Sequence, residues 1–186
     1  ELPDLYLQAT VAVEDHRFYA HPGFDAIATM RALVNNLRAG AIVEGGSTIT
    51  QQLAKNQYFT QEQTIERKVA EVFMALTMEQ HFSKRTILEL YVNSIYFGDG
   101  HTGIGPASEG YFGKRPADLT ADECTLLAGI PNAPSAYALS EHSELARKRQ
   151  EHVLEKLVAY DYLERGDARL IVARAAAKEP PAWQSA

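Results

Sequence analysis

The chain has 186 residues, and its 18 Lys and Arg residues against 24 Asp and Glu residues give a net charge of −6 and a pI near 5.5. This acidic balance argues against a non-specific nucleic-acid binder. The hydrophobic fraction of 46% and the charged fraction of 23% are typical of a globular chain and exclude a disordered or collagen-like one. The single cysteine, Cys124, cannot form an intramolecular disulfide, so we expect the fold to be held by packing.

The sequence also limits how the protein relates to a membrane. No apolar run approaches the ~18 residues that a membrane span requires, so we expect no part of this sequence to cross a bilayer. The chain starts at Glu1 without a signal sequence, which we interpret as an excised domain or a processed chain whose anchor lay upstream. We predict one domain of two lobes over residues 1–178 and a linker-like tail over residues 179–186.

Helical spacing dominates the sequence, and no stretch longer than a few residues alternates as a strand does, so the predicted fold class is mostly α. Asp25 is placed to cap a helix that ends at Gly40 and whose apolar residues are Ile27, Met30, Val34 and Leu37. Residues 40–46 are expected to form a flexible apolar flap. Ser47 is placed to cap a second helix that runs to about residue 59.

The segment 64–81 carries two stripes at helical spacing. Its apolar stripe consists of Ile65, Val69, Val72, Phe73 and Leu76, and we expect this face to enter a core. The opposite stripe consists of Arg67, Glu71, Met74 and Met78. Because that stripe mixes charged residues with methionines, we expect the helix to be enclosed on both sides.

The remaining helices are predicted from their capping residues. They run from Ser83 to about residue 96, from Thr120 to Gly129, from about residue 141 to 159, and over 167–178. The stretch 96–113 contains six glycines, which predicts irregular backbone or a short hairpin.

Several kinds of active site can be excluded from motif spacing. The six histidines and one cysteine do not have the spacing of a zinc site. The sequence has no phosphate-binding loop, no GxSxG nucleophile motif and no SxxK motif. The remaining kind of active site is one that uses carboxylate side chains.

The first candidate carboxylate is Glu14, in the segment EDHRF. On a continuous helix Glu14, Phe18 and His21 would lie on one face, and a glutamate held against an aromatic ring would have a raised pKa. The alternative is an exposed acidic turn with ordinary structural histidines at positions 16 and 21.

The second candidate is Glu71, which follows Arg67 by four residues and Lys68 by three. The alternative interpretation is a surface ion pair of little energetic consequence. Between the two carboxylates lies the segment GGSTITQQLAK, which places polar side chains near a helix N-terminus: Ser47, Thr48, Gln51, Gln52 and Lys55. Such a surface suits an anionic or sugar ligand, and its alternative is a polar outer face.

Taken together, these segments resemble the peptidoglycan glycosyltransferase family, which includes the transglycosylase domain of class A penicillin-binding proteins and monofunctional transglycosylases. The similarity covers about residues 5–160. The matching motifs are EDxxFxxHxG (14–23), GGSTITQQ (45–52), RKxxE (67–71), ILExYxN (87–93) and YFGxG (96–100).

This resemblance implies a lysozyme-like helical head lobe and a smaller membrane-facing lobe, with a cleft between them. It implies polymerisation of lipid II with inversion at the anomeric carbon and release of undecaprenyl pyrophosphate. The implied partners are lipid II, the nascent glycan chain, the bacterial membrane surface and, in some members, a transpeptidase domain, but not nucleic acid. The implied location is the outer face of the bacterial cytoplasmic membrane.

By resemblance the catalytic residues are Glu14 and Glu71. An attacking alcohol needs a base, and Glu14 suits this role. A departing pyrophosphate needs positive charge, which Lys55, Arg67 and Lys68 would supply. Glu71 would orient these cations or help to hold a divalent cation, Mg²⁺ or Mn²⁺, although no cofactor is expected to be required.

The expected substrate contacts are Ser47, Thr48, Gln51, Gln52 and Asn93. We expect Glu14 and the basic residues to face each other across a shared groove. The chain departs from the family at Gln63, where an arginine that contacts pyrophosphate is common. Loss of that charge-assisted contact is expected to weaken donor binding and slow the enzyme.

Two alternatives to this function remain open. A lysozyme-like hydrolase or lytic transglycosylase would also use a glutamate in a helical cleft, but it must protonate an alcohol leaving group and does not require a cluster of cations. A non-catalytic helical module that binds lipid II is the second alternative.

Overall fold

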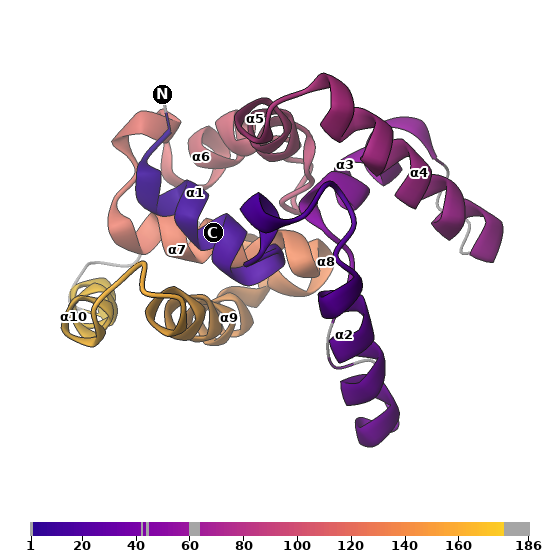
Figure 1. Ribbon diagram of the computed structural model, residues 1–186. Helices are drawn as coiled ribbons and strands as arrows, with labels where there is room; N and C mark the ends of the chain where they lie inside the picture. Colours follow the sequence, from indigo (N-terminus) through magenta and orange to yellow (C-terminus); the bar gives the residue numbers. More distant parts are fainter. Residues whose placement is uncertain (1, 42, 44, 60–63, 177–186) are drawn as a thin grey trace. The chain divides into compact units, whose positions relative to one another are not determined.

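The computed structural model describes residues 2–41, 43, 45–59 and 64–176. Within these ranges the regular elements are helices (Figure 1). This confirms the mostly α fold class. An isolated antiparallel bridge joins Tyr96 and Thr102. None of the helices in the described ranges has the length and apolar character needed to cross a membrane. The chain divides into two compact units, unit 1 (Glu1–His16 and Val92–Ala186) and unit 2 (Arg17–Tyr91).

Unit 1 is built around a short buried helix, α7 (Ala121–Gly129). Every residue of α7 from 122 to 129 is buried, and the helix packs against α1 and α9, as Figure 1 shows. Burial raises the pKa of the Cys124 thiol on this helix to about 12, which makes it an unreactive core residue. The other helices of this unit are α1 (Asp4–Glu14), α6 (Ile104–Phe112), α8 (Pro134–Tyr137), α9 (Leu139–Ala159) and α10 (Arg165–Ala176).

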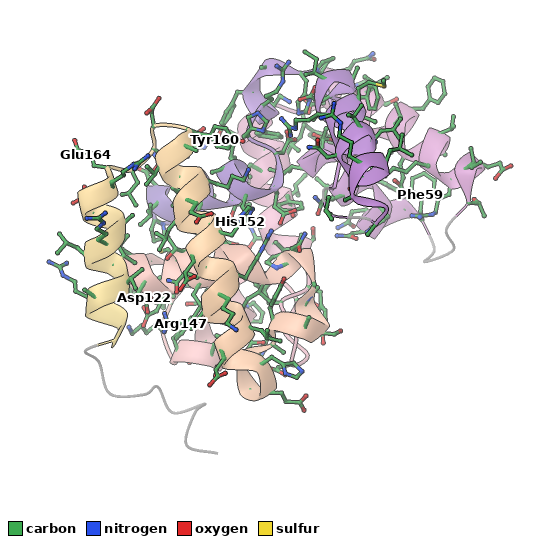
Figure 2. All side chains as sticks on the ribbon, turned by 90° about the horizontal axis from the view of Figure 1, so that it is seen from below. Phe59, Asp122, Arg147, His152, Tyr160 and Glu164 are labelled. Atoms are coloured by element: carbon green, nitrogen blue, oxygen red, sulfur yellow. The ribbon has the colours of Figure 1, made fainter. Side chains whose placement is uncertain are left out.

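A buried polar network joins α7 to α9 (Figure 2). Gln150 donates from Nε2 to Asp122 Oδ1 and to Thr125 Oγ1, both over 2.8 Å. Arg147 Nη1 donates to the same Asp122 oxygen. Since these buried polar groups satisfy one another, the network fixes the register of the two helices without leaving a desolvated group unpaired.

Unit 2 contains a 3-10 turn (Phe18–Ala20), α2 (Ala26–Ala39), α3 (Ile49–Tyr58), α4 (Ile65–His81) and most of α5 (Lys84–Ser94). Helix α3 packs on α4. The predicted ends of α2 are confirmed: Asp25 Oδ1 accepts hydrogen bonds from the N–H groups of Ile27 and Ala28 over 3.0 Å each, and Gly40 ends the helix with φ +64°.

Helix α4 lies with the opposite face inward from the one predicted. Ile65 is 80% exposed and Phe73 is 67% exposed, whereas Glu71, Ala75 and Met78 are buried. The prediction that the apolar stripe enters a core, and that the helix is enclosed on both sides, was therefore wrong. The physical reason is that Arg67 and Lys68 on α4 neutralise Glu71, which allows the mixed stripe to face the rest of unit 2.

The glycine-rich stretch also differs from its prediction. The bridge at residues 96–102 fits the expected short hairpin, but α6 follows at once, with Gly113 ending it at φ +62°. Gly103 and Gly113 bound this helix, and Gly105 and Gly110 lie within it. The capping box of Thr120 and Glu123 is confirmed, and the last helix begins at residue 165, two residues earlier than expected. The predicted tail over residues 179–186 lies outside the described residues.

Candidate active site

Glu14 is the last residue of α1, in unit 1, and it is half-buried. The helix ends there because Asp15 adopts an extended φ of −161°, and a separate 3-10 turn begins at Phe18. The predicted continuous helical face of Glu14, Phe18 and His21 was therefore wrong. The alternative of an exposed acidic turn does not describe the segment either, since Asp15 and His21 are both buried.

The segment after Glu14 is held tightly within unit 2. Gly23 has φ +104°, and a Cβ atom at this position would lie 2.7 Å from the carbonyl oxygen of Ala75. Thr48 Oγ1 donates to the carbonyl oxygen of Gly23 over 2.6 Å. The Gly23 N–H donates to His21 Nδ1 over 3.1 Å, which confirms the structural interpretation of that histidine. The motif therefore needs glycine here for packing against α4.

The N-terminus of α3 is one residue later than predicted. Thr48, not Ser47, is its capping residue: Thr48 Oγ1 accepts from the Gln51 N–H, and Gln51 Oε1 accepts from the Thr48 N–H, both over 3.1 Å. Thr48 and Gln51 are each 2% exposed. Both side chains therefore hold the start of α3 in place, and their direct contact with substrate stays a prediction.

Four of the predicted site residues come together beside this cap. Glu71 is 1% exposed; its Oε1 accepts from Arg67 Nη1 and its Oε2 accepts from Lys68 Nζ over 2.9 Å. Lys68 Nζ also donates to Ser47 Oγ over 2.8 Å. The alternative of a surface ion pair was therefore wrong, because the carboxylate is inside the protein. We call Ser47, Arg67, Lys68 and Glu71 the cation cluster.

The cation cluster carries two positive charges against one negative charge, so it retains an excess of positive charge. The Lys68 side chain is 49% exposed and that of Arg67 is 14% exposed. Among the residues that the structure describes, Arg67 Nε has no hydrogen-bond partner. A cluster of this kind suits an anionic group with several oxygen acceptors.

The same geometry bears on the expected divalent cation at Glu71. Both oxygens of this carboxylate already accept hydrogen bonds from cationic groups. Mg²⁺ and Mn²⁺ prefer several oxygen ligands, and two fixed cations beside the carboxylate would repel such an ion. The hydrogen-bond donors around Glu71 therefore suit a carboxylate that orients Arg67 and Lys68, and they do not suit a metal ligand.

The remaining predicted site residues lie on several elements. Gln52, on α3, accepts a hydrogen bond at Oε1 from the Tyr91 hydroxyl over 3.0 Å, and Lys55 lies half-buried near the end of the same helix. Asn93 is exposed near the end of α5, in unit 1. Because Glu14 and Asn93 belong to unit 1 and the cation cluster to unit 2, their predicted shared groove stays a prediction. Gln63 lies outside the described residues.

Helix α2, which precedes the predicted flap in the chain, has an exposed apolar surface. Ala32 is the buried residue of this helix, while its larger apolar residues are 39–73% exposed: Ile27, Met30, Leu33, Val34 and Leu37. Val43, in the flap, is 63% exposed, and Ile42 lies outside the described residues.

Sequence reasoning missed three polar residues that join the elements of unit 2. Glu79 Oε1 accepts hydrogen bonds from Thr50 Oγ1 over 2.6 Å and from Lys84 Nζ over 2.8 Å. Each residue belongs to a different helix, so spacing along a single helix could not have paired them. The Glu79 side chain is only 8% exposed, which indicates that its hydrogen bonds to Thr50 and Lys84 hold the helices together.

The chain is similar to known proteins in both sequence and fold. The family model described as Transglycosylase matches residues 1–158. Penicillin-binding protein 1A of Aquifex aeolicus is 45% identical over 163 residues, which are 88% of this chain and 22% of that protein. Penicillin-binding protein 1F of Bacillus subtilis is 44% identical over 168 residues, 90% of this chain and 24% of that protein.

Two further matches differ in how much of the relative they cover. A transglycosylase-like protein of Cupriavidus necator is 42% identical over 167 residues, 90% of this chain and 72% of that protein. In fold, the crystal structure of penicillin-binding protein 1A from Haemophilus influenzae matches with a TM-score of 0.54 at 21% identity, over 97% of this chain and 16% of that one. The chain thus spans about a quarter or less of its penicillin-binding relatives.

Proposed function

This chain belongs to the transglycosylase family, and from that membership we propose that it polymerises lipid II into glycan strands. In this reaction the 4-hydroxyl of the acceptor GlcNAc attacks C1 of the donor MurNAc. The bond from C1 to the pyrophosphate oxygen breaks, C1 inverts, and undecaprenyl pyrophosphate leaves. The hydroxyl proton passes to a base on the protein.

The cation cluster is the observation that supports this proposal most directly. A lipid pyrophosphate develops negative charge as it leaves, and fixed cations stabilise such charge without reorganising. Lys68 and Arg67 are held in place by a buried Glu71, so their charges are oriented before substrate binds. Lys55, on the neighbouring helix, would add to this field. A lysozyme-like hydrolase has no comparable need for cations.

Glu14 is the base in this proposal. A positioned carboxylate contributes a factor of about 10² to 10⁴ to such a proton transfer. Glu71 orients Arg67 and Lys68 and donates no proton, because pyrophosphate is already a good leaving group. Ser47, Gln52 and Asn93 would contact the sugars or phosphates, and no step of the reaction runs through a metal ion.

Lipid II resides in a membrane, so the proposal includes a membrane-facing surface. We assign this role to the exposed apolar residues of α2 and to Val43. Apolar patches of this kind on a protein surface mark contacts with lipids or proteins. In this proposal residues 1–178 form one domain at the outer face of the cytoplasmic membrane, with unit 1 as a lysozyme-like head lobe and unit 2 as the lobe that meets lipid.

The decisive experiment compares two substrates. Incubated with lipid II in detergent, the protein is expected to produce glycan polymers on a gel, with and without a chelator. Incubated with preformed sacculus, it is expected to release nothing. Release of soluble muropeptides would favour the hydrolase, and binding of lipid II without turnover would favour the non-catalytic module. Activity that disappears with chelator would restore the metal hypothesis.

A further inference from the structure

A lysine outside the cation cluster makes three contacts with its surroundings in unit 2. Lys84, the first residue of α5, donates from Nζ to the carbonyl oxygen of His21 over 2.6 Å and to Glu79 Oε1 over 2.8 Å. The same Nζ lies 4.3 Å from the centre of the Phe18 ring. The Lys84 side chain is 22% exposed. This ammonium is therefore held between a carbonyl, a carboxylate and an aromatic face.

The carboxylate in this arrangement has a second donor. Glu79 Oε1 accepts a hydrogen bond from Thr50 Oγ1 over 2.6 Å, and Thr50 is fully buried in the first turn of α3. We call Thr50, Glu79 and Lys84, with the carbonyl of His21, the Lys84 junction. It links the start of α3, the last turn of α4, the start of α5 and the segment that follows Glu14.

These links bear on the cation cluster. Ser47 lies three residues before Thr50 and accepts a hydrogen bond from Lys68. Lys68 and Glu71 are on α4, the helix that carries Glu79. Helix α3 is thus joined to α4 at two points along the polar side of α4, once through Ser47 and once through Thr50. Loss of the second link would let the start of α3 move relative to Arg67 and Lys68.

We propose that Lys84 and Glu79 are positioning residues for glycan polymerisation: they hold α3 and the Phe18–Gly23 segment in register with the cation cluster. This inference rests on the proposed function. Neither residue need touch substrate, because their effect passes through Thr50 and the His21 carbonyl. Displacement of a catalytic group by about 1 Å can cost a factor of about 10² in rate.

The main test replaces Lys84 by methionine, which keeps the length of the side chain and removes the charge and the donors. We expect Lys84→Met to lower kcat for lipid II by a factor of about 10 to 100, with KM changed less than threefold. Measurements are made at a temperature where circular dichroism shows the variant to be folded. Lys84→Arg, which keeps charge and donors, is expected to restore kcat to within about threefold of wild type.

The control is Lys114→Met. Lys114 forms a comparable ion pair with Glu123 over 2.7 Å, but it lies in unit 1. We expect this variant to lose thermal stability and to keep kcat. If Lys84→Met keeps kcat within twofold of wild type, or if its loss of activity follows its unfolded fraction, the proposal is wrong. An increase in KM alone would also contradict it, because that would make Lys84 a binding residue.

A second variant covers the case in which Lys84→Met does not fold. Thr50→Val keeps the shape of the side chain and removes only the hydrogen bond to Glu79. We expect faster hydrogen exchange at the amides of residues 49–53 and a fall in kcat. This exchange measurement needs no turnover, so it tests the junction even if the wild-type protein fails to polymerise lipid II. Unchanged exchange and unchanged kcat in Thr50→Val would overturn the proposal.

Discussion

Lys68 donates a hydrogen bond to Glu71 over 2.9 Å, and the two side chains differ sharply in exposure. The lysine side chain is 49% exposed and the glutamate side chain is 1% exposed. The carboxylate is thus a fixed internal anchor, while the ammonium reaches the surface. An ammonium has three N–H donors, and its bonds to Glu71 and Ser47 occupy two of them. In the proposed reaction the third would donate to a phosphate oxygen.

The first prediction concerns this anchor. Glu71→Gln keeps the shape of the side chain but leaves Arg67 and Lys68 without a counter-charge. We expect the free energy of unfolding to fall by about 1–3 kcal/mol, because the hydrogen bonds between this buried side chain and its charged donors become weaker. We expect polymerisation to fall by a factor of about 10² to 10³, as when a preorganised charge contact is removed. Urea denaturation and the lipid II gel assay measure the two effects.

Glu66→Gln is the matched control for this substitution. Glu66 lies in the first turn of the same helix, and it is exposed. We expect its stability change to stay within about 0.5 kcal/mol, with polymerisation unaffected. If Glu71→Gln polymerised as well as Glu66→Gln, Glu71 would have no role in orienting the cations.

The second prediction concerns the proposed base. Glu14→Gln removes the proton acceptor and keeps the size of the side chain, so we expect polymerisation to fall by a factor of about 10² to 10⁴. Binding of lipid II, measured by fluorescence anisotropy, should be retained. Asp4→Asn, at the exposed start of the same helix, should leave both unchanged. Persistent polymerisation in Glu14→Gln would require a different base.

The sequence predicted local features of this fold well, because they depend on neighbouring residues. Asp25 caps α2, Gly40 ends it, and Thr120 pairs with Glu123, as their spacing requires. The association of Glu71 with Arg67 and Lys68 is also local, since three and four residues separate neighbours on a helix. What spacing cannot determine is which side of α4 faces inward.

That choice depends on how α4 packs on other helices of the fold. Standard hydrophobic patterning places Ile65 and Phe73 inside, yet both are exposed, and the buried residues of α4 are Glu71, Ala75 and Met78. Such a reversal is typical of a functional surface, where a rule of folding is set aside locally. The Lys84 junction was missed for the same reason: Thr50, Glu79 and Lys84 come from three helices.

The third prediction is a pH dependence. Burial raises the pKa of Asp25, but hydrogen bonding from the Ala28 N–H and the nearby Arg17 guanidinium outweigh it and hold that pKa below its ordinary value. Because the pKa is lower in the folded chain than in the unfolded chain, ionised Asp25 stabilises the fold above about pH 4. This contribution is lost as pH falls through the folded-state pKa.

Asp25→Asn tests this dependence, since asparagine caps helices as well as aspartate does and only the charge is removed. We expect a loss of about 1 kcal/mol at pH 7 that shrinks toward zero near pH 2, measured by urea denaturation at several pH values. Asp118→Asn is the control, because the Arg115–Asp118 pair has the same 2.9 Å distance as Arg17–Asp25 but is exposed. A difference between wild type and Asp25→Asn that did not vary with pH would contradict the assignment.

The fourth prediction tests the membrane-facing surface. Leu33 and Leu37 of α2 are 50% and 73% exposed, so replacing both by serine should cost little stability. We expect this double variant to co-sediment less with liposomes of anionic and neutral lipids, because apolar area available for insertion is lost. Leu170→Ser is the control: Leu170 is 52% exposed on α10, in unit 1. Equal co-sedimentation of the two variants would exclude α2 as the lipid contact.

The fifth prediction separates two reasons for keeping glycine in the segment after Glu14. Gly23 and Gly40 both have positive φ, at +104° and +64°, so alanine is strained at either site. Only at Gly23 would the added Cβ atom collide with backbone, 2.7 Å from the Ala75 carbonyl oxygen, whereas nothing lies within 4 Å of a Cβ at Gly40. Alanine would therefore be strained in its backbone at both positions, but only at Gly23 would its Cβ atom also collide with a neighbouring backbone.

We expect Gly40→Ala to lower the free energy of unfolding by about 1–2 kcal/mol, the cost of a left-handed backbone. Gly23→Ala should lose about 1–3 kcal/mol more, because α4 must move away from the new methyl group. Movement of α4 shifts Glu79 and the cation cluster with it, so Gly23→Ala should also slow polymerisation, unlike Gly40→Ala. Equal stability losses and equal rates in the two variants would show that Gly23 is required only for its backbone conformation.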